Sequence, residues 1–214
     1  MNGYTHIIWD FNGTVLDDVQ AGISSMNEIL AQRGLPILAD KAAYREVFGF
    51  PVESYYLRVG LDLEKEDFKA VLAPLWVELY KRNSQDAKLY GGVRPLAAAL
   101  RGRGMRQSIL SASHSDMLRD QLAERKALEL FDEIWGTDTI NAYGKSELAC
   151  EWRRAHPDDK VLLIGDTTHD FEVAELIGAD CVLVADGHHS RQKLLACGCP
   201  VVDRLEELAD LLPI

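Results

Sequence analysis

Short apolar runs alternate with longer stretches of helical periodicity along most of the chain. The runs cover positions 6–9, 106–110, 133–136, 161–164, 181–184 and 200–202. Runs of this length, rich in aliphatic and β-branched residues, are typical of buried strands. Because helical patterns separate them, the sequence predicts an α/β fold with a doubly wound, mostly parallel sheet.

The stretch from Asp17 to Leu89 has helical periodicity and needs no strand. Gly34 and Pro36 are expected to end its first helix, Gly49-Phe50-Pro51 its second, and Pro74 to kink or reset its third. Apolar residues of the third helix recur at helical spacing: Phe68, Val71, Leu72, Leu75, Trp76 and Leu79. Residues 17–89 are therefore predicted to be a helical insertion, and residues 1–16 and 90–214 the α/β domain.

Composition and charge narrow the function classes. The 214 residues carry a net charge of −11, which argues against nucleic acid or an anionic membrane as the main partner. Neither a long apolar span nor a signal-type N-terminus is present, so we expect a cytoplasmic protein. The four cysteines are expected to be free thiols, since Cys197-Gly198-Cys199 has no second pair to complete a zinc site.

Polar side chains follow the predicted strands where ligands bind in open α/β sheets. Asp10 ends the strand at 6–9, Ser111 follows the strand at 106–110, and Asp166 follows the strand at 161–164. Asp170 lies four residues after Asp166, and two carboxylates beside Asp10 would make an oxygen site that suits Mg²⁺. The alternative is a helix N-cap with an acidic first turn, which explains one of the two acids.

Four segments resemble, in order, the four motifs of the haloacid dehalogenase superfamily, most of whose members are phosphatases. They are Asp10-x-x-Gly13-Thr14, the strand-end Ser111, Lys145 at a helix start, and Gly165-Asp166-x-x-x-Asp170. The resemblance implies that Asp10 attacks phosphorus and forms an aspartyl-phosphate. It implies a substrate site of Thr14, Ser111, Ala112 and Lys145, and a Mg²⁺ site of Asp10, Asp166, Asp170 and the backbone carbonyl of Asn12.

In that family, the position of residues 17–89 is occupied by a helical cap that closes over the active site. Gly49 and Phe50, near Tyr55-Tyr56, are candidates to face the substrate, or else residues of a helix junction. The cap and the chain length are most similar to phosphoglycolate phosphatases and their relatives. The resemblance thus implies a phosphatase that hydrolyses a small phosphorylated metabolite, with Mg²⁺ as cofactor. We expect a monomer or a homodimer, between which the sequence does not decide.

The chain departs from the family at Asn12, where the first motif usually has a second Asp. That Asp protonates the leaving oxygen and then deprotonates water, whereas an amide cannot exchange a proton near neutral pH. The protein is then a phosphatase with His114 or His169 as substitute or with a good leaving group, or a weak or inactive protein that binds a phospho-ligand. Deamidation of Asn12-Gly13 and a phosphonatase or dehalogenase reaction are further alternatives.

Overall fold

The computed structural model describes residues 3–137 and 145–211, and its centre is a six-stranded parallel sheet. The strand order is β5-β4-β1-β6-β7-β8. The strands are β1 (His6–Trp9), β4 (Arg106–His114), β5 (Glu133–Thr137), β6 (Val161–Gly165), β7 (Asp180–Val184) and β8 (Val201–Val202). The order runs outward in both directions from β1, which confirms the predicted doubly wound α/β fold.

Helices cover both faces of the sheet, so its central strands are buried on both sides. Ile7 and Trp9 of β1 belong to one hydrophobic cluster and Ile8 to the other, as the alternation of side chains along a strand requires. The same alternation in β6 explains its four consecutive aliphatic residues. The covering helices are α5 (Val93–Gly102), α6 (Ser115–Glu124), η2 (Leu128–Leu130), α7 (Lys145–Ala155), α8 (Thr168–Leu176), α9 (Arg191–Leu195), η4 (Leu205–Glu207) and α10 (Leu208–Leu211).

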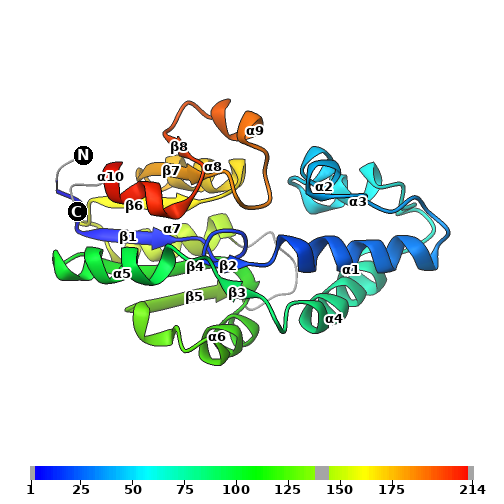
Figure 1. Cartoon of the computed structure of the whole chain (residues 1–214), viewed down its shortest axis with the longest axis horizontal. Coiled ribbons are helices and arrows are strands. Elements are labelled where there is room, and N and C mark those ends of the chain that lie inside the picture. Colours follow the sequence, from blue (N-terminus) through cyan, green and yellow to red (C-terminus); the bar gives the residue numbers. More distant parts are fainter. Residues whose placement is uncertain (1–2, 138–144, 212–214) are drawn as a thin grey trace.

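The segment between β1 and β4 forms a helical unit, which we define as residues 19–83. Its helices are α1 (Val19–Gln32), α2 (Lys41–Val47), α3 (Val52–Arg58), the π-helical turn η1 (Phe68–Leu72) and α4 (Ala73–Asn83). They enclose a hydrophobic cluster of their own, and Figure 1 shows them beyond the end of the sheet to which β1 points. Strands β2 (Leu16–Asp17) and β3 (Lys88–Leu89) pair antiparallel where the chain enters and leaves this unit.

Local signals in the helical unit act mostly as expected. Gly34 has a φ of +66° just beyond α1, and α2 ends before Gly49. Pro74 lies in the first turn of α4, directly after η1, so it marks a new helix rather than a kink within one. Helix α3 and the β2–β3 pair were not predicted, because both are short. Within the described residues, no helix has the length and apolarity to cross a membrane.

Candidate active site

Several of the motif residues lie at or beyond the carboxyl ends of the strands, where they line one cavity of about 1020 Å³. Asp10 follows β1, Ser111 and Ala112 lie in β4, Lys145 begins α7, and Asp170 lies in α8, and all of them line the cavity. The helical unit supplies the opposite wall. The cavity therefore lies between a polar sheet edge and a set of helices, as in other open α/β sheets.

Lys145 is a buried cation held between two carboxylates. Its side chain is 4% exposed, and its Nζ donates to Asp10 and, over 2.5 Å, to Asp170. Burial would lower the pKa of Lys145, but the two carboxylates raise it above its ordinary value. Burial raises the pKa of Asp10 despite the lysine. Burial also opposes ionisation of Asp170, yet Lys145 holds the pKa of that carboxyl below its ordinary value.

Asp166 is completely buried and is held by two donors from neighbouring loops. The Thr14 hydroxyl donates to its Oδ1 over 3.0 Å, and the backbone N–H of His188 donates to its Oδ2 over 2.6 Å. Burial raises the pKa of Asp166 to about 6. Gly13, at φ +78°, and Gly187 let the backbone pass close to the Asp166 carboxylate, because a Cβ at either position would lie within 2.3 Å of Asp166 Oδ2.

The acidic cluster has the chemistry of a magnesium site. Carboxylate oxygens of Asp10, Asp166 and Asp170 lie within 4.8 Å of one another, and all three residues are buried. Lys145 is paired with only two of the three, so the cluster has an excess of negative charge. Burial of the excess charge is what raises the pKa of Asp10 and Asp166, and a hard divalent cation would relieve it. Asp170 Oδ2 also accepts from Thr167 in a capping box, so the same residue belongs to the acidic cluster and to a helix cap.

Asn12 is fixed by hydrogen bonds on both ends of its amide. Its Nδ2 donates to Asp18 Oδ2 over 2.9 Å and to the Tyr80 hydroxyl over 2.7 Å, and its Oδ1 accepts from the Ser113 hydroxyl over 2.8 Å. Tyr80 belongs to α4, so this amide connects the sheet edge with the helical unit. An ionised Asp at position 12 could not donate a hydrogen bond to Asp18, so these contacts favour an amide at this position.

A family model described as haloacid dehalogenase-like hydrolase matches residues 7–184 of this sequence. The chain belongs to the haloacid dehalogenase-like hydrolase family. The match begins in β1 and ends with β7, so it includes every motif residue described above. The α/β fold, the order of the motifs and the family match agree.

Sequence identity to individual relatives is low. The chain is 26% identical over 186 residues to tyrosine-protein kinase PtkA of Mycobacterium tuberculosis, covering 85% of this chain and 62% of that one. It thus spans less than two thirds of that relative. Identity is also 26% over 198 residues to phosphoglycolate phosphatase of Synechococcus elongatus, covering 91% and 89%. The solved structure of the haloacid dehalogenase-like hydrolase SP0104 from Streptococcus pneumoniae has a TM-score of 0.82 at 20% identity, covering 99% of both chains.

Two residues of this haloacid dehalogenase-like hydrolase escaped sequence reasoning. Asp18 lies just before helix α1, and its buried carboxylate accepts from Asn12, Tyr80 and the Gly13 N–H. His188 lies beyond β7, and its Nε2 lies 3.3 Å from Asp18 Oδ1. Burial opposes protonation of His188, yet Asp18 raises its pKa to about 9. The sequence signal that could have pointed to His188 is its position shortly after β7, at the edge of the sheet where ligands bind.

The remaining expected residues are divided between the cavity and its surroundings. Phe50 lines the cavity, whereas Gly49 and Thr14 are not among its lining residues. Ser111 is buried, and its Oγ accepts from the Ser113 N–H over 3.1 Å, which leaves its hydroxyl proton available to a ligand. His114 and His169 line the cavity too. Their Nδ1 atoms contact the Asp116 N–H and the Glu172 carboxylate, respectively.

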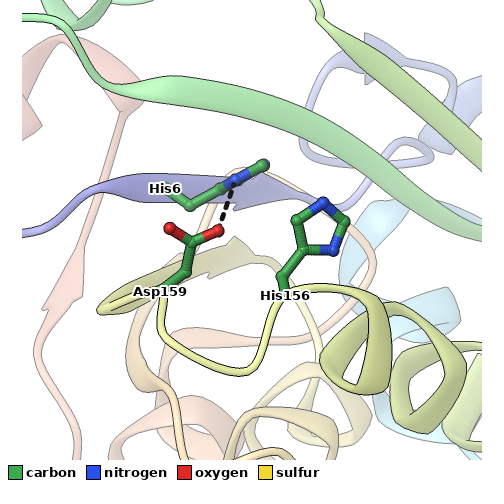
Figure 2. Close-up of side chains that lie close together, drawn as sticks. All are labelled: His6, His156 and Asp159. Atoms are coloured by element: carbon green, nitrogen blue, oxygen red, sulfur yellow. Dashed lines mark ion pairs between the residues drawn. The ribbon is translucent and has the colours of Figure 1, made fainter.

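A second titratable cluster lies at the amino end of β1 and consists of His6, His156 and Asp159. Figure 2 shows His6 on β1 and the other two on the turn that leads from α7 to β6. His6 Nδ1 lies 3.4 Å from Asp159 Oδ2, but Arg106 also pairs with Asp159. Both nitrogens of His156 contact protein oxygens, those of Trp152 and Glu133. The single carboxylate of this cluster thus has a protein cation of its own in Arg106, unlike Asp166 in the acidic cluster, which Lys145 does not reach.

Proposed function

We propose that the protein is a Mg²⁺-dependent phosphatase that hydrolyses a phosphomonoester of a small metabolite through a phosphorylated Asp10. The observation that carries this proposal is the buried Asp10–Lys145–Asp170 arrangement at the wall of a large cavity, next to Asp166. A carboxylate held in place beside a buried cation is suited to nucleophilic attack on a phosphoryl group.

Each residue has a role in the proposed reaction. The Asp10 carboxylate attacks phosphorus in line, and the ester oxygen leaves with its bonding electrons. Lys145 and the Ser111 hydroxyl stabilise the negative charge on the phosphoryl oxygens. Water then attacks the phosphorus of the aspartyl-phosphate and releases the Asp10 carboxylate. Bound to Asp10, Asp166, Asp170 and the carbonyl of Asn12, Mg²⁺ would screen the repulsion between carboxylate and phosphate.

We also propose that the helical unit serves as the cap of this active site. Its α4 already contacts the sheet edge through the Tyr80 hydroxyl, which donates to Asp18 Oδ2 over 2.5 Å. Arg45 of α2 makes a second connection, donating to the backbone carbonyls of Asp186 and Gly187. These contacts hold the unit over the cavity and would exclude bulk water from the phosphoryl group.

Phosphate release by the purified chain tests the proposal. The substrates are phosphoglycolate, a sugar phosphate, acetyl phosphate and pyrophosphate, each with Mg²⁺ and with a chelator. We expect release that requires Mg²⁺ and falls by about 10⁴-fold or more in Asp10→Asn, because the nucleophile is lost. The exposed Asp86→Asn is the matched control and should retain wild-type turnover.

Two outcomes would contradict the phosphatase proposal. Equal turnover by Asp10→Asn would place the nucleophile elsewhere. Silence of the wild type on every substrate, with Mg²⁺-dependent binding of a phospho-ligand, would favour the alternative of a binding protein. Calorimetric titration with inorganic phosphate, with and without Mg²⁺, distinguishes that alternative from an inactive preparation.

A further inference from the structure

The helical unit lines the cavity with an aromatic wall. We give this name to Phe48, Phe50, Tyr55, Tyr56, Phe68 and Trp76, all of which line the cavity. Five of these rings contact one another in series, with centroid distances such as 5.2 Å for Phe48 and Tyr55 and 5.0 Å for Tyr56 and Phe68. The sixth ring, Trp76, stacks on Tyr80 at 4.8 Å. A preassembled set of rings offers flat apolar surface, which suits a flat apolar ligand.

Charge along the cavity disfavours a second anionic group on the substrate. Two of the cations that line the cavity are already paired with carboxylates, Lys145 with Asp10 and Asp170, and His188 with Asp18. Lys81 is the one other Lys or Arg among the lining residues, and it is exposed. Besides Asp10, Asp18 and Asp170, five acidic residues line the same cavity: Glu53, Asp116, Asp120, Glu124 and Glu172. Arg45 and Arg58 donate to backbone carbonyls and are not lining residues. A carboxylate or second phosphate would therefore meet mainly like charge.

Asn12 restricts the leaving group independently of the wall. Its amide has no proton to give, and both of its ends already bond to Asp18, Tyr80 and Ser113. An alkyl alcohol, whose pKa is near that of water at about 15.7, leaves poorly without an acid. A phenol, with a pKa of about 10 as in tyrosine, is a far better leaving group.

From these observations we propose that the substrate is an aryl phosphate monoester whose ring bears no second anionic group. The inference rests on the proposed phosphatase function and names its substrate class. The Asp10 carboxylate forms a bond to phosphorus, and the bond from phosphorus to the phenolic oxygen breaks. The phenoxide leaves with the electron pair and is protonated by solvent, so no protein acid is needed.

The wall also has one place for a polar substituent on the ring. Tyr55 is 2% exposed and lines the cavity, and its hydroxyl has no hydrogen-bond partner among the described residues. A buried hydroxyl without a partner is costly, so a ligand that bonds to it gains affinity. An uncharged acceptor on the ring, such as a carbonyl or an amide oxygen, fits this hydroxyl.

Matched substrates distinguish the effect of the leaving group on turnover from the effect of a second anionic group. We expect kcat/KM for phenyl phosphate to exceed that for phosphoglycolate by at least about tenfold. Benzyl phosphate has a similar ring but an alkyl leaving oxygen, and its kcat should be lower by about 10² with a similar KM. A 4-carbamoylphenyl ester should be a better substrate than the 4-carboxyphenyl ester by about tenfold, because only the latter adds an anion.

Variants of the wall test whether the rings bind the substrate. Trp76→Leu and Phe50→Leu should each lower the ratio of kcat/KM for phenyl phosphate to that for acetyl phosphate by about tenfold. Leu57→Ala is the control, because Leu57 is 56% exposed and does not line the cavity. It should retain the wild-type ratio. Circular dichroism establishes that each variant is folded, and using two wall variants keeps the test decisive if one is not.

The outcomes distinguish this proposal from the one on which it rests. Turnover of phosphoglycolate equal to or above that of phenyl phosphate would overturn the aryl class and leave the phosphatase function standing. An unchanged ratio in both wall variants would do the same. If no substrate, acetyl phosphate included, releases phosphate, the phosphatase function itself fails.

Discussion

The two ends of strand β1 carry clusters of similar geometry and different electrostatics. At the carboxyl end, Asp10, Asp166 and Asp170 place three buried carboxylates beside one lysine. At the amino end lie His6, His156 and Asp159, which Figure 2 shows together. Each of these three residues also contacts other protein groups. Both clusters bring potential metal ligands within 4.8 Å, yet only the first has charge that the protein leaves uncompensated. Proximity of ligand atoms alone therefore does not identify a functional site.

Removing Lys145 is the strongest way to test the carboxyl end. In Lys145→Met, the buried carboxylates of Asp10 and Asp170 lose their cation, which should lower the free energy of unfolding by about 3–5 kcal/mol. Turnover should fall by about 10²–10³-fold, because charge on the phosphoryl oxygens is no longer stabilised. Denaturant unfolding and phosphate release measure the two effects. Lys160→Met, at the amino end, is the control for the substitution and should retain turnover, and equal turnover by Lys145→Met would contradict the role given to this lysine.

Metal-dependent stability tests the difference between the clusters directly. Saturating Mg²⁺ should raise the free energy of unfolding of the wild type, by about 2.7 kcal/mol at one hundred times the dissociation constant. Asp166→Asn should lose most of this gain, whereas His156→Gln should keep it, since its cluster is not the site. Thermal unfolding with and without Mg²⁺ is the measurement. A gain that depends on His156 instead would reverse the comparison.

A further carboxylate at the carboxyl end of β1 should increase the excess of negative charge there. Asn12→Asp would put a second carboxyl beside Asp18, and we expect it to lower the free energy of unfolding by roughly 2 kcal/mol. Two unit charges 4 Å apart repel by about 4 kcal/mol at an effective dielectric constant of 20, and uptake of a proton relieves part of that. Denaturant unfolding checks the value.

The double variant Asn12→Asp with Asp18→Asn is the matched control for this change. It restores one carboxyl and one amide with their positions exchanged, so the repulsion is removed and part of the lost stability should return, although Asp18 no longer pairs with His188. If the single variant is as stable as the wild type, the hydrogen bond from Asn12 to Asp18 does not fix this part of the site.

Sequence reasoning reached the sheet and the motif residues because both are locally encoded. Four aliphatic residues before Gly165-Asp166 indicate a buried strand and its ligand edge without knowledge of the fold. The network of Asn12, Asp18, Tyr80 and His188 was missed, since its hydrogen-bonded members lie up to 170 positions apart and meet only after the helical unit folds. Helix periodicity placed Trp76 among the apolar residues of its helix, but it could not place that ring at a cavity wall.

His6, at the amino end of β1, should make the free energy of unfolding depend on pH, and the variant His6→Gln should remove this dependence. Burial, together with the neighbouring Arg106 guanidinium, lowers the pKa of His6 to about 4, against about 6.5 in the unfolded chain. Between these values the unfolded state binds more protons, so this histidine contributes stability above pH 6.5 that is lost as the pH falls. The loss between pH 7 and 5.5 should be about 1 kcal/mol larger in the wild type than in His6→Gln. Denaturant unfolding at the two pH values measures it, and equal losses would mean that His6 is not kept neutral by the fold.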